Sequence, residues 1–93
     1  MPYQDQIDYD KLPEHIRGGM QRYIDDGILP GSFLQAVIKD QLVESFSLAD
    51  ETNIERMFDI AGFMYNEAPR GCRGSKEVMM KWHEKGGLNK ILK

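Results

Sequence analysis

The 93-residue chain has one cysteine, two histidines and no long apolar run. A single cysteine excludes an intrachain disulfide, and neither histidine has a histidine or cysteine three or four residues away to build a local zinc site. No segment approaches the roughly 18 apolar residues that a membrane span requires. The acidic first residues lack the apolar region of a signal peptide. We therefore expect a cytoplasmic protein that needs no metal or cofactor and does not enter a membrane.

Strand-like alternation is also missing, whereas apolar residues recur at helical spacing in four capped stretches. The first predicted helix begins near Pro13 and ends at Gly27, where glycine suits a left-handed cap. The second runs from Ser32 to about Phe46 and is predicted to be buried, because one face carries only apolar side chains: Leu34, Ile38, Leu42 and Phe46.

The third predicted helix begins between Ser47 and Thr52 and ends before Pro69. The fourth is capped by Ser75 and ends at the Gly86-Gly87 pair. The sequence thus predicts one all-α domain over residues 1–93, a small bundle of about four short helices with a Gly/Arg-rich loop between the third and fourth helices. Residues 1–9 are expected to form a polar tail and residues 88–93 a basic, frayed tail.

Apolar residues surround the third predicted helix on more than one side. One stripe follows a regular helical period, and Ile60 and Phe63 lie off that stripe; its members are Ile54, Met57, Phe58, Ala61, Met64, Tyr65 and Ala68. Two apolar faces are typical of a central helix or of a helix that faces a second subunit. A chain this short also has a small core, so we expect a homo-oligomer.

Charge is divided unevenly along the chain. Residues 1–68 carry thirteen acidic and five basic side chains, whereas residues 69–93 carry two acidic and seven basic ones. Either the basic end docks on the acidic part of the same fold, or it presents a surface to an anionic ligand. The net charge of −3 argues against general nucleic-acid binding.

The loop 70–76 is the candidate ligand site. It places arginines, glycines, a serine and a lysine directly before a helix, and helix N-termini and guanidinium groups both bind anions. It is not a P-loop, because serine precedes lysine and a helix precedes the loop. The candidate ligand-binding residues are Arg70, Arg73, Ser75 and Lys76, with Asn66 and the aromatic side chains of Tyr65, Tyr23 and Trp82 nearby. The alternative is a capped turn whose arginines pair with the acidic part of the chain.

No residues are predicted to be catalytic. The neighbouring arginines would lower the pKa of Cys72, but His83 lies about 12 Å further along the next helix, too far to act as its base. No acid–base pair converges elsewhere. A DNA-reading helix is set aside, because residues 32–46 carry only Lys39 as a cation.

Between Leu12 and Trp82 four segments read LPEHIRGGMQRYIDDGI, PGSFLQAVI, ADETN and FMYNEAPRGCRGS. With these segments the chain resembles a functionally uncharacterised group of short proteins encoded by bacteriophages and prophages. The resemblance implies a phage setting in the host cytoplasm and carries over no catalytic residue.

Two hypotheses of function follow. In the first, a small phage-type accessory binding protein, with counter-defence as one role, captures an anionic small molecule such as a signalling nucleotide. In the second, a protein-interaction module binds a host or phage protein through the apolar faces of the second and third predicted helices. A virion or DNA-packaging accessory role and an enzymatic role stay open behind these two.

Overall fold

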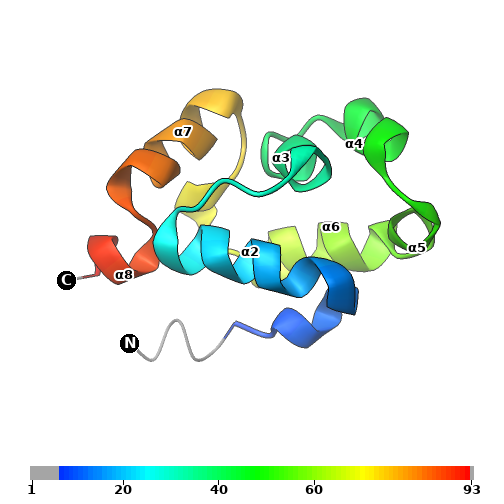
Figure 1. Cartoon of the computed structure of the whole chain (residues 1–93), viewed down its shortest axis with the longest axis horizontal. Helices are drawn as coiled ribbons and strands as arrows, with labels where there is room; N and C mark the ends of the chain where they lie inside the picture. Colours follow the sequence, from blue (N-terminus) through cyan, green and yellow to red (C-terminus); the bar gives the residue numbers. More distant parts are fainter. Residues whose placement is uncertain (1–6, 93) are drawn as a thin grey trace.

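The computed structural model describes residues 7–92. This part of the chain is helical and contains no strand, which confirms the all-α prediction (Figure 1). There are more helices than the four expected: η1 (Tyr9–Lys11), α2 (Glu14–Asp26), α3 (Ser32–Ile38), α4 (Leu42–Leu48), α5 (Glu51–Glu55), α6 (Met57–Asn66), η2 (Arg70–Cys72), α7 (Lys76–Lys85) and α8 (Leu88–Ile91). No helix in residues 7–92 combines the length and apolarity that crossing a membrane requires.

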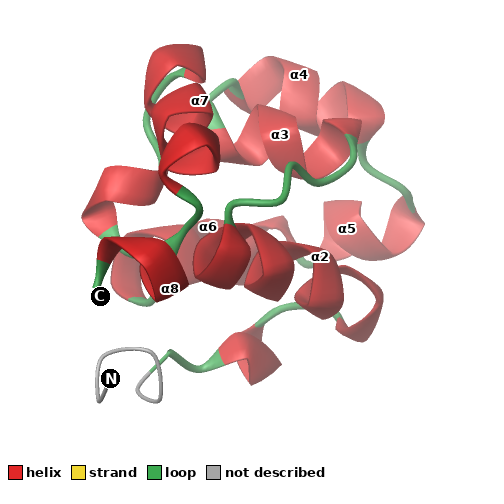
Figure 2. Ribbon diagram, turned by 60° about the vertical axis from the view of Figure 1, so that its left-hand side comes forward, coloured by secondary structure: helices red, strands yellow, loops and turns green. Residues whose placement is uncertain are grey.

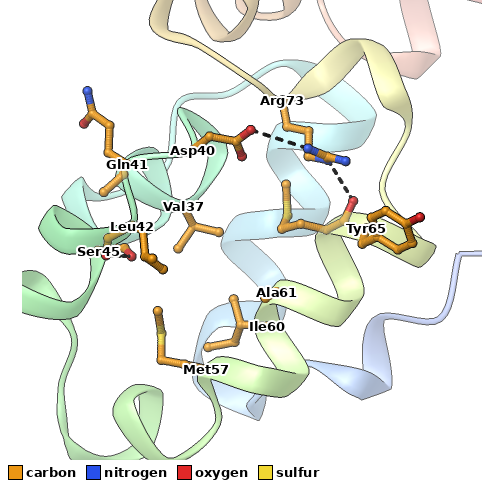
Figure 3. Close-up of a pocket in the computed structure, with 12 residues that line it drawn as sticks. Val37, Asp40, Gln41, Leu42, Ser45, Met57, Ile60, Ala61, Tyr65 and Arg73 are labelled. Atoms are coloured by element: carbon orange, nitrogen blue, oxygen red, sulfur yellow. Dashed lines mark hydrogen bonds and ion pairs between the residues drawn. The ribbon is translucent and has the colours of Figure 1, made fainter.

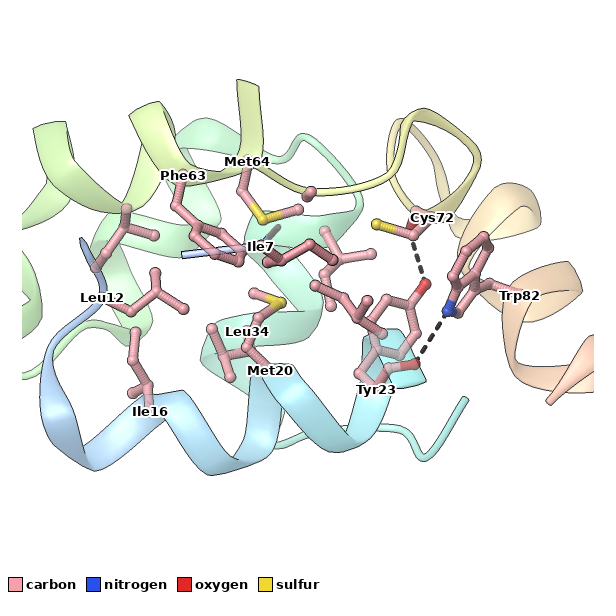
Figure 4. Close-up of a cluster of buried hydrophobic side chains, with 14 of the residues drawn as sticks. Ile7, Leu12, Ile16, Met20, Tyr23, Leu34, Phe63, Met64, Cys72 and Trp82 are labelled. Atoms are coloured by element: carbon pink, nitrogen blue, oxygen red, sulfur yellow. Dashed lines mark hydrogen bonds between the residues drawn. The ribbon is translucent and has the colours of Figure 1, made fainter. Parts of the chain in front are cut away.

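The helices form two layers around one core. In Figure 2, α3, α4 and α7 lie on one side, and α2, α6 and α8 lie on the other. The body measures 38 × 26 × 18 Å along its principal axes. Side chains from both layers fill the space between them (Figure 4), among them Leu12, Ile16, Met20, Tyr23, Ile24, Leu34, Ile38, Ile60, Phe63, Met64, Met79, Trp82 and Leu88.

Helix α2 follows its sequence prediction closely. Its N-cap is Pro13, and Gly27 ends it with a φ of 73°, in the left-handed region that glycine tolerates. The apolar stripe of α2 is buried, with Ile16, Met20 and Tyr23 in the core. Local capping and a single apolar face were therefore sufficient to locate this helix.

The C-terminal end of α2 is joined to α7 and α8 by polar contacts. The indole Nε1 of Trp82 donates a hydrogen bond to the Tyr23 carbonyl at 3.0 Å, and His83 Nδ1 lies 2.7 Å from the Gly27 carbonyl. At Gly87 a Cβ would lie 2.6 Å from the backbone of Asp25, so only glycine allows this approach. The Tyr23 carbonyl, which also accepts the Gly27 N–H at 2.8 Å, and the Gly27 carbonyl thus hold α7 against the end of α2.

The prediction of a frayed tail is wrong for residues 88–92, because residues 88–91 form α8, which packs against α2. Lys93 lies outside the described residues. Leu88 is buried at the start of α8, and Asn89 Nδ2 donates to the Asp26 carboxylate at 2.8 Å. At the other end, residues 1–6 of the expected N-terminal tail lie outside the described residues. Ile7 is buried, and the ring of Tyr9 packs on Phe63 with centroids 5.5 Å apart. Tertiary contacts therefore order both of these short segments.

The second predicted helix is divided into α3 and α4, which corrects the prediction of one helix to Phe46. Asp40 has a φ of 58°, and the Gln41 N–H donates back to the Ala36 carbonyl at 3.0 Å. This pattern ends a helix and turns the chain. As a result Leu42 and Phe46 are exposed, although they continue the apolar face that is buried in α3.

The third predicted helix also begins and packs differently from expectation. Its cap is Asp50, whose carboxylate accepts the Asn53 N–H at 2.8 Å, and a break at Arg56 separates α5 from α6. The core side of α6 is made by the residues off the regular stripe, Ile60 and Phe63, together with Met64. The stripe residues Ile54, Phe58, Ala61 and Tyr65 are exposed.

Candidate functional site

Arg73, the central residue of the predicted anion loop, is bound within the fold. Its Nε donates to the Met64 carbonyl at 3.0 Å, and its guanidinium lies 3.5 Å from the Asp40 carboxylate. Of the ion pairs found between described residues, only this one joins the basic region 69–93 to the acidic region before it. Arg73 thereby connects the α3–α4 turn to α6.

The other loop residues do not converge on a common cavity. Ser75 is the α7 cap that the sequence predicted, and its hydroxyl accepts the Val78 N–H at 3.1 Å. The side chains of Arg70 and Lys76 are exposed and form no hydrogen bond or ion pair with another described residue. Asn66 is exposed at the end of α6. The loop thus offers separate cations at the surface instead of an enclosed anion site.

Two of the candidate aromatic residues belong to the core. Tyr23 is fully buried and its hydroxyl donates to the Cys72 carbonyl at 2.6 Å, while Trp82 packs beside it (Figure 4). Neither ring is free to stack on a ligand. Tyr65, by contrast, is exposed on α6 and shares the wall of a groove with Arg73.

Cys72 is a buried thiol. Burial raises its pKa to about 12, and the opposing effect of the Arg73 charge is smaller. The expectation that the loop arginines lower this pKa is therefore corrected, since desolvation penalises the thiolate more than a nearby cation favours it. No cluster of three metal-ligating side chains lies within residues 7–92.

An apolar groove of about 400 Å³ lies between the α3–α4 pair and α6 (Figure 3). Its walls come from Leu42 and Ser45 on one side and from Ala61 and Tyr65 on the other. The Arg73–Asp40 ion pair lies at one end, and the remaining lining residues are Ala36, Val37, Gln41, Met57, Ile60 and Met64. We call this cavity the α4–α6 groove.

Exposed apolar side chains are concentrated on α4, α5 and α6, and two of them, Leu42 and Tyr65, line the groove. Of the ten large apolar side chains that are exposed among the described residues, seven lie between positions 42 and 65. The exposed fractions are 68 % for Leu42, 83 % for Val43, 89 % for Phe58 and 79 % for Tyr65; the others are Phe46, Leu48 and Ile54. These seven side chains are called the apolar surface below.

Helix α4 is the clearest part of this pattern. It carries Leu42, Val43, Phe46 and Leu48, yet the only residue it buries is Ser45, whose hydroxyl donates to the Leu42 carbonyl at 2.7 Å. A helix normally gains stability by burying its apolar face. Within the described chain, α4 leaves that face uncovered.

A second, more polar hollow of about 590 Å³ lies between α2, residues 28–34 and the start of α5. His15 Nε2 is 3.0 Å from the Asp50 carboxylate on its wall, and the side-chain oxygen of Asn53 is buried there without a hydrogen-bond partner. Its lining mixes apolar and polar groups, so it favours no single class of ligand.

Comparison with known proteins adds no assignment: no protein-family model, curated protein sequence or solved structure matches this chain. The resemblance to short phage proteins therefore stays a prediction.

The groove and the exposure of α4 were not found from the sequence. The available signal was the number of apolar residues between positions 42 and 65, which exceeds what one buried face of each short helix can accommodate. The sequence could not show that α3 ends in a turn at Asp40, and this turn places Leu42 at the surface.

Proposed function

We propose that this protein is an interaction module that binds another protein through the α4–α6 groove and the apolar surface around it. The observation that carries the proposal is helix α4, which presents four large apolar side chains and buries none of them. Large exposed apolar patches on small domains mark sites of interaction. If the chain is a phage protein, as its resemblance implies, the partner is a host or phage protein.

The size of the apolar surface favours a protein over a small molecule. Phe58 and Tyr65 alone present on the order of 300 Å², taking about 200 Å² for each aromatic side chain. Adding about 100 Å² for each exposed aliphatic side chain brings the whole surface to several hundred Å². A standard protein interface buries about 800 Å² on each partner. The groove would then accept apolar side chains of a partner that also contacts the surface outside the groove.

Capture of an anionic small molecule receives less support from the geometry. Arg73 is already paired, Arg70 and Lys76 lie at the surface, and Tyr23 and Trp82 are in the core. An enclosed site that binds phosphate usually brings several donors to one point. The loop lacks this convergence among the described residues.

The test is selection of binding peptides from a random library displayed on yeast, with no bias in charge or helicity. Enriched peptides should lose at least about ten-fold in affinity on Leu42→Asp or Phe58→Asp, which corresponds to about 1.4 kcal/mol. Ile91→Asp is the matched control, because it places the same charge on an exposed apolar position of α8. Circular dichroism checks that the variants stay folded. Failure to enrich any peptide, or equal binding to Leu42→Asp, contradicts the proposal.

A further inference from the structure

We infer that the partner segment that occupies the α4–α6 groove is an amphipathic helix whose polar flanks carry lysine and arginine. This inference rests on the proposed function and adds the conformation and charge of the partner. Three features of the described chain lead to it: the absence of a free strand edge, the space beside α6 and the excess of acidic side chains in residues 40–59.

The backbone of the partner must satisfy its own hydrogen bonds. Residues 7–92 contain no strand, so the chain offers no sheet edge to which an extended peptide could add. The groove walls are mainly apolar side chains, which can neither donate to nor accept from a peptide backbone. Because an unpaired backbone group is costly once it is buried, a helical segment is the form that fits an apolar groove.

The exposed side of α6 leaves room for another helix. Ala61 lines the groove with a single methyl group, and a Cβ added at Gly62 would meet no atom within 4 Å. Small side chains shorten the distance at which two helices pack. Phe58 and Tyr65 stand one turn before and one turn after this point, so they would flank a helix placed across it.

The charge of this region selects a basic partner. Residues 40–59 contain six acidic side chains and one basic side chain, Arg56. Arg56 is itself paired with Asp59 at 2.6 Å. Glu44, Glu51 and Glu55 are exposed and have no ion-pair partner among the described residues. Such a surface attracts lysine and arginine and repels acidic segments.

The same charge argues against a symmetric dimer of this chain that is formed through the groove. A symmetric dimer places the same patch on both subunits, so its acidic residues would face one another. Like charges brought together across an interface are unfavourable. A two-fold homo-oligomer of this chain would therefore have to use another surface.

The experiment uses three fluorescent peptides of about four helical turns. The first carries leucines at i, i+3, i+4 and i+7 with lysines on the other face, the second replaces every lysine with glutamate, and the third scrambles the first. Binding to the full chain is measured by fluorescence anisotropy at low and high salt. The lysine peptide should bind at least about ten-fold more tightly than either control and weaken as salt rises.

Charge reversal on α4 and α5 separates this inference from a general affinity for apolar peptides. The triple variant Glu44→Lys, Glu51→Lys and Glu55→Lys should lose about ten-fold in affinity for the lysine peptide and gain affinity for the glutamate peptide. The control variant Glu77→Lys with Glu84→Lys changes α7 and should retain the wild-type preference.

The outcomes distinguish the two proposals. Groove-dependent binders that prove neutral, acidic or extended overturn this inference and leave the proposed function intact. Absence of any groove-dependent binder overturns both. Sedimentation that shows a dimer of the wild-type chain, lost in Leu42→Asp and retained in Ile91→Asp, would identify a second copy as the occupant and refute the inference.

Discussion

Replacing Tyr23 with phenylalanine tests the polar contact at the centre of the core. The Tyr23 hydroxyl is buried and donates to the Cys72 carbonyl at 2.6 Å. This bond connects α2 to the turn η2, which precedes α7. Tyr23→Phe removes one oxygen, preserves the ring, and leaves the Cys72 carbonyl without this donor.

The expected cost follows from that geometry. A buried acceptor that loses its partner destabilises the folded state by about 1–3 kcal/mol. In a domain of this size each kcal/mol lowers the midpoint of thermal unfolding by about 4–8 °C. Tyr23→Phe should therefore lower the free energy of unfolding by about 1–3 kcal/mol without changing its dependence on denaturant concentration.

Urea unfolding followed by tryptophan fluorescence measures this change. Trp82 is the only tryptophan and therefore the fluorescent probe. Its Nε1 donates a hydrogen bond to the backbone carbonyl of residue 23, which Tyr23→Phe leaves in place. Tyr65→Phe removes the same atom from an exposed ring and should change stability by less than about 0.5 kcal/mol. Equal effects of the two substitutions would refute the reasoning, because burial would then make no difference.

Three further predictions concern glycines and the thiol. Gly87→Ala should destabilise the fold by at least about 2 kcal/mol, because Gly87 has a φ of 73° and the new Cβ would lie 2.6 Å from the Asp25 backbone. A thermal midpoint close to that of the wild type would contradict the packing of α8. Gly62→Ala should stabilise α6 by about 0.5–1 kcal/mol, since the added methyl group meets open space; thermal unfolding tests this, and a lower midpoint would show that the site is crowded. Burial raises the pKa of the Cys72 thiol from its usual 9.0 to about 12. As pH rises, the thiol of the unfolded chain therefore loses its proton before the thiol of the folded chain does. The contribution of Cys72 to the free energy of unfolding is constant below pH 9.0 and declines between pH 9.0 and about 12. Urea midpoints measured across this range should decline less steeply in Cys72→Ala, and an identical decline would indicate that the thiol is not protected.

Part of the candidate site could be predicted from the sequence. Tyr65 and Arg73 were candidates and do line the groove, although Arg73 holds Asp40 and the Met64 carbonyl instead of standing free. The apolar faces of the second and third predicted helices were already the basis of the interaction hypothesis. The groove itself was missed, because it requires α4 to turn away from α3 and to lie opposite α6.

The sequence by itself determined the helices whose ends are encoded locally. Ser75 caps α7, and Gly27 and Gly86 end α2 and α7 in the left-handed conformation. Capping depends on side chains within a few residues, so it is legible in the sequence. The single apolar stripe of α2 likewise left only one face to bury.

Only the tertiary structure decided which of two apolar faces became the core. Around α6 both faces are apolar, and helical period cannot rank them. Packing against η1 and the rest of the core buries Ile60 and Phe63 and leaves Phe58 outside. The turn at Asp40 likewise depends on how α3 and α4 pack against each other. Burial is a property of what lies opposite a face, and the order of residues along one helix does not contain that information.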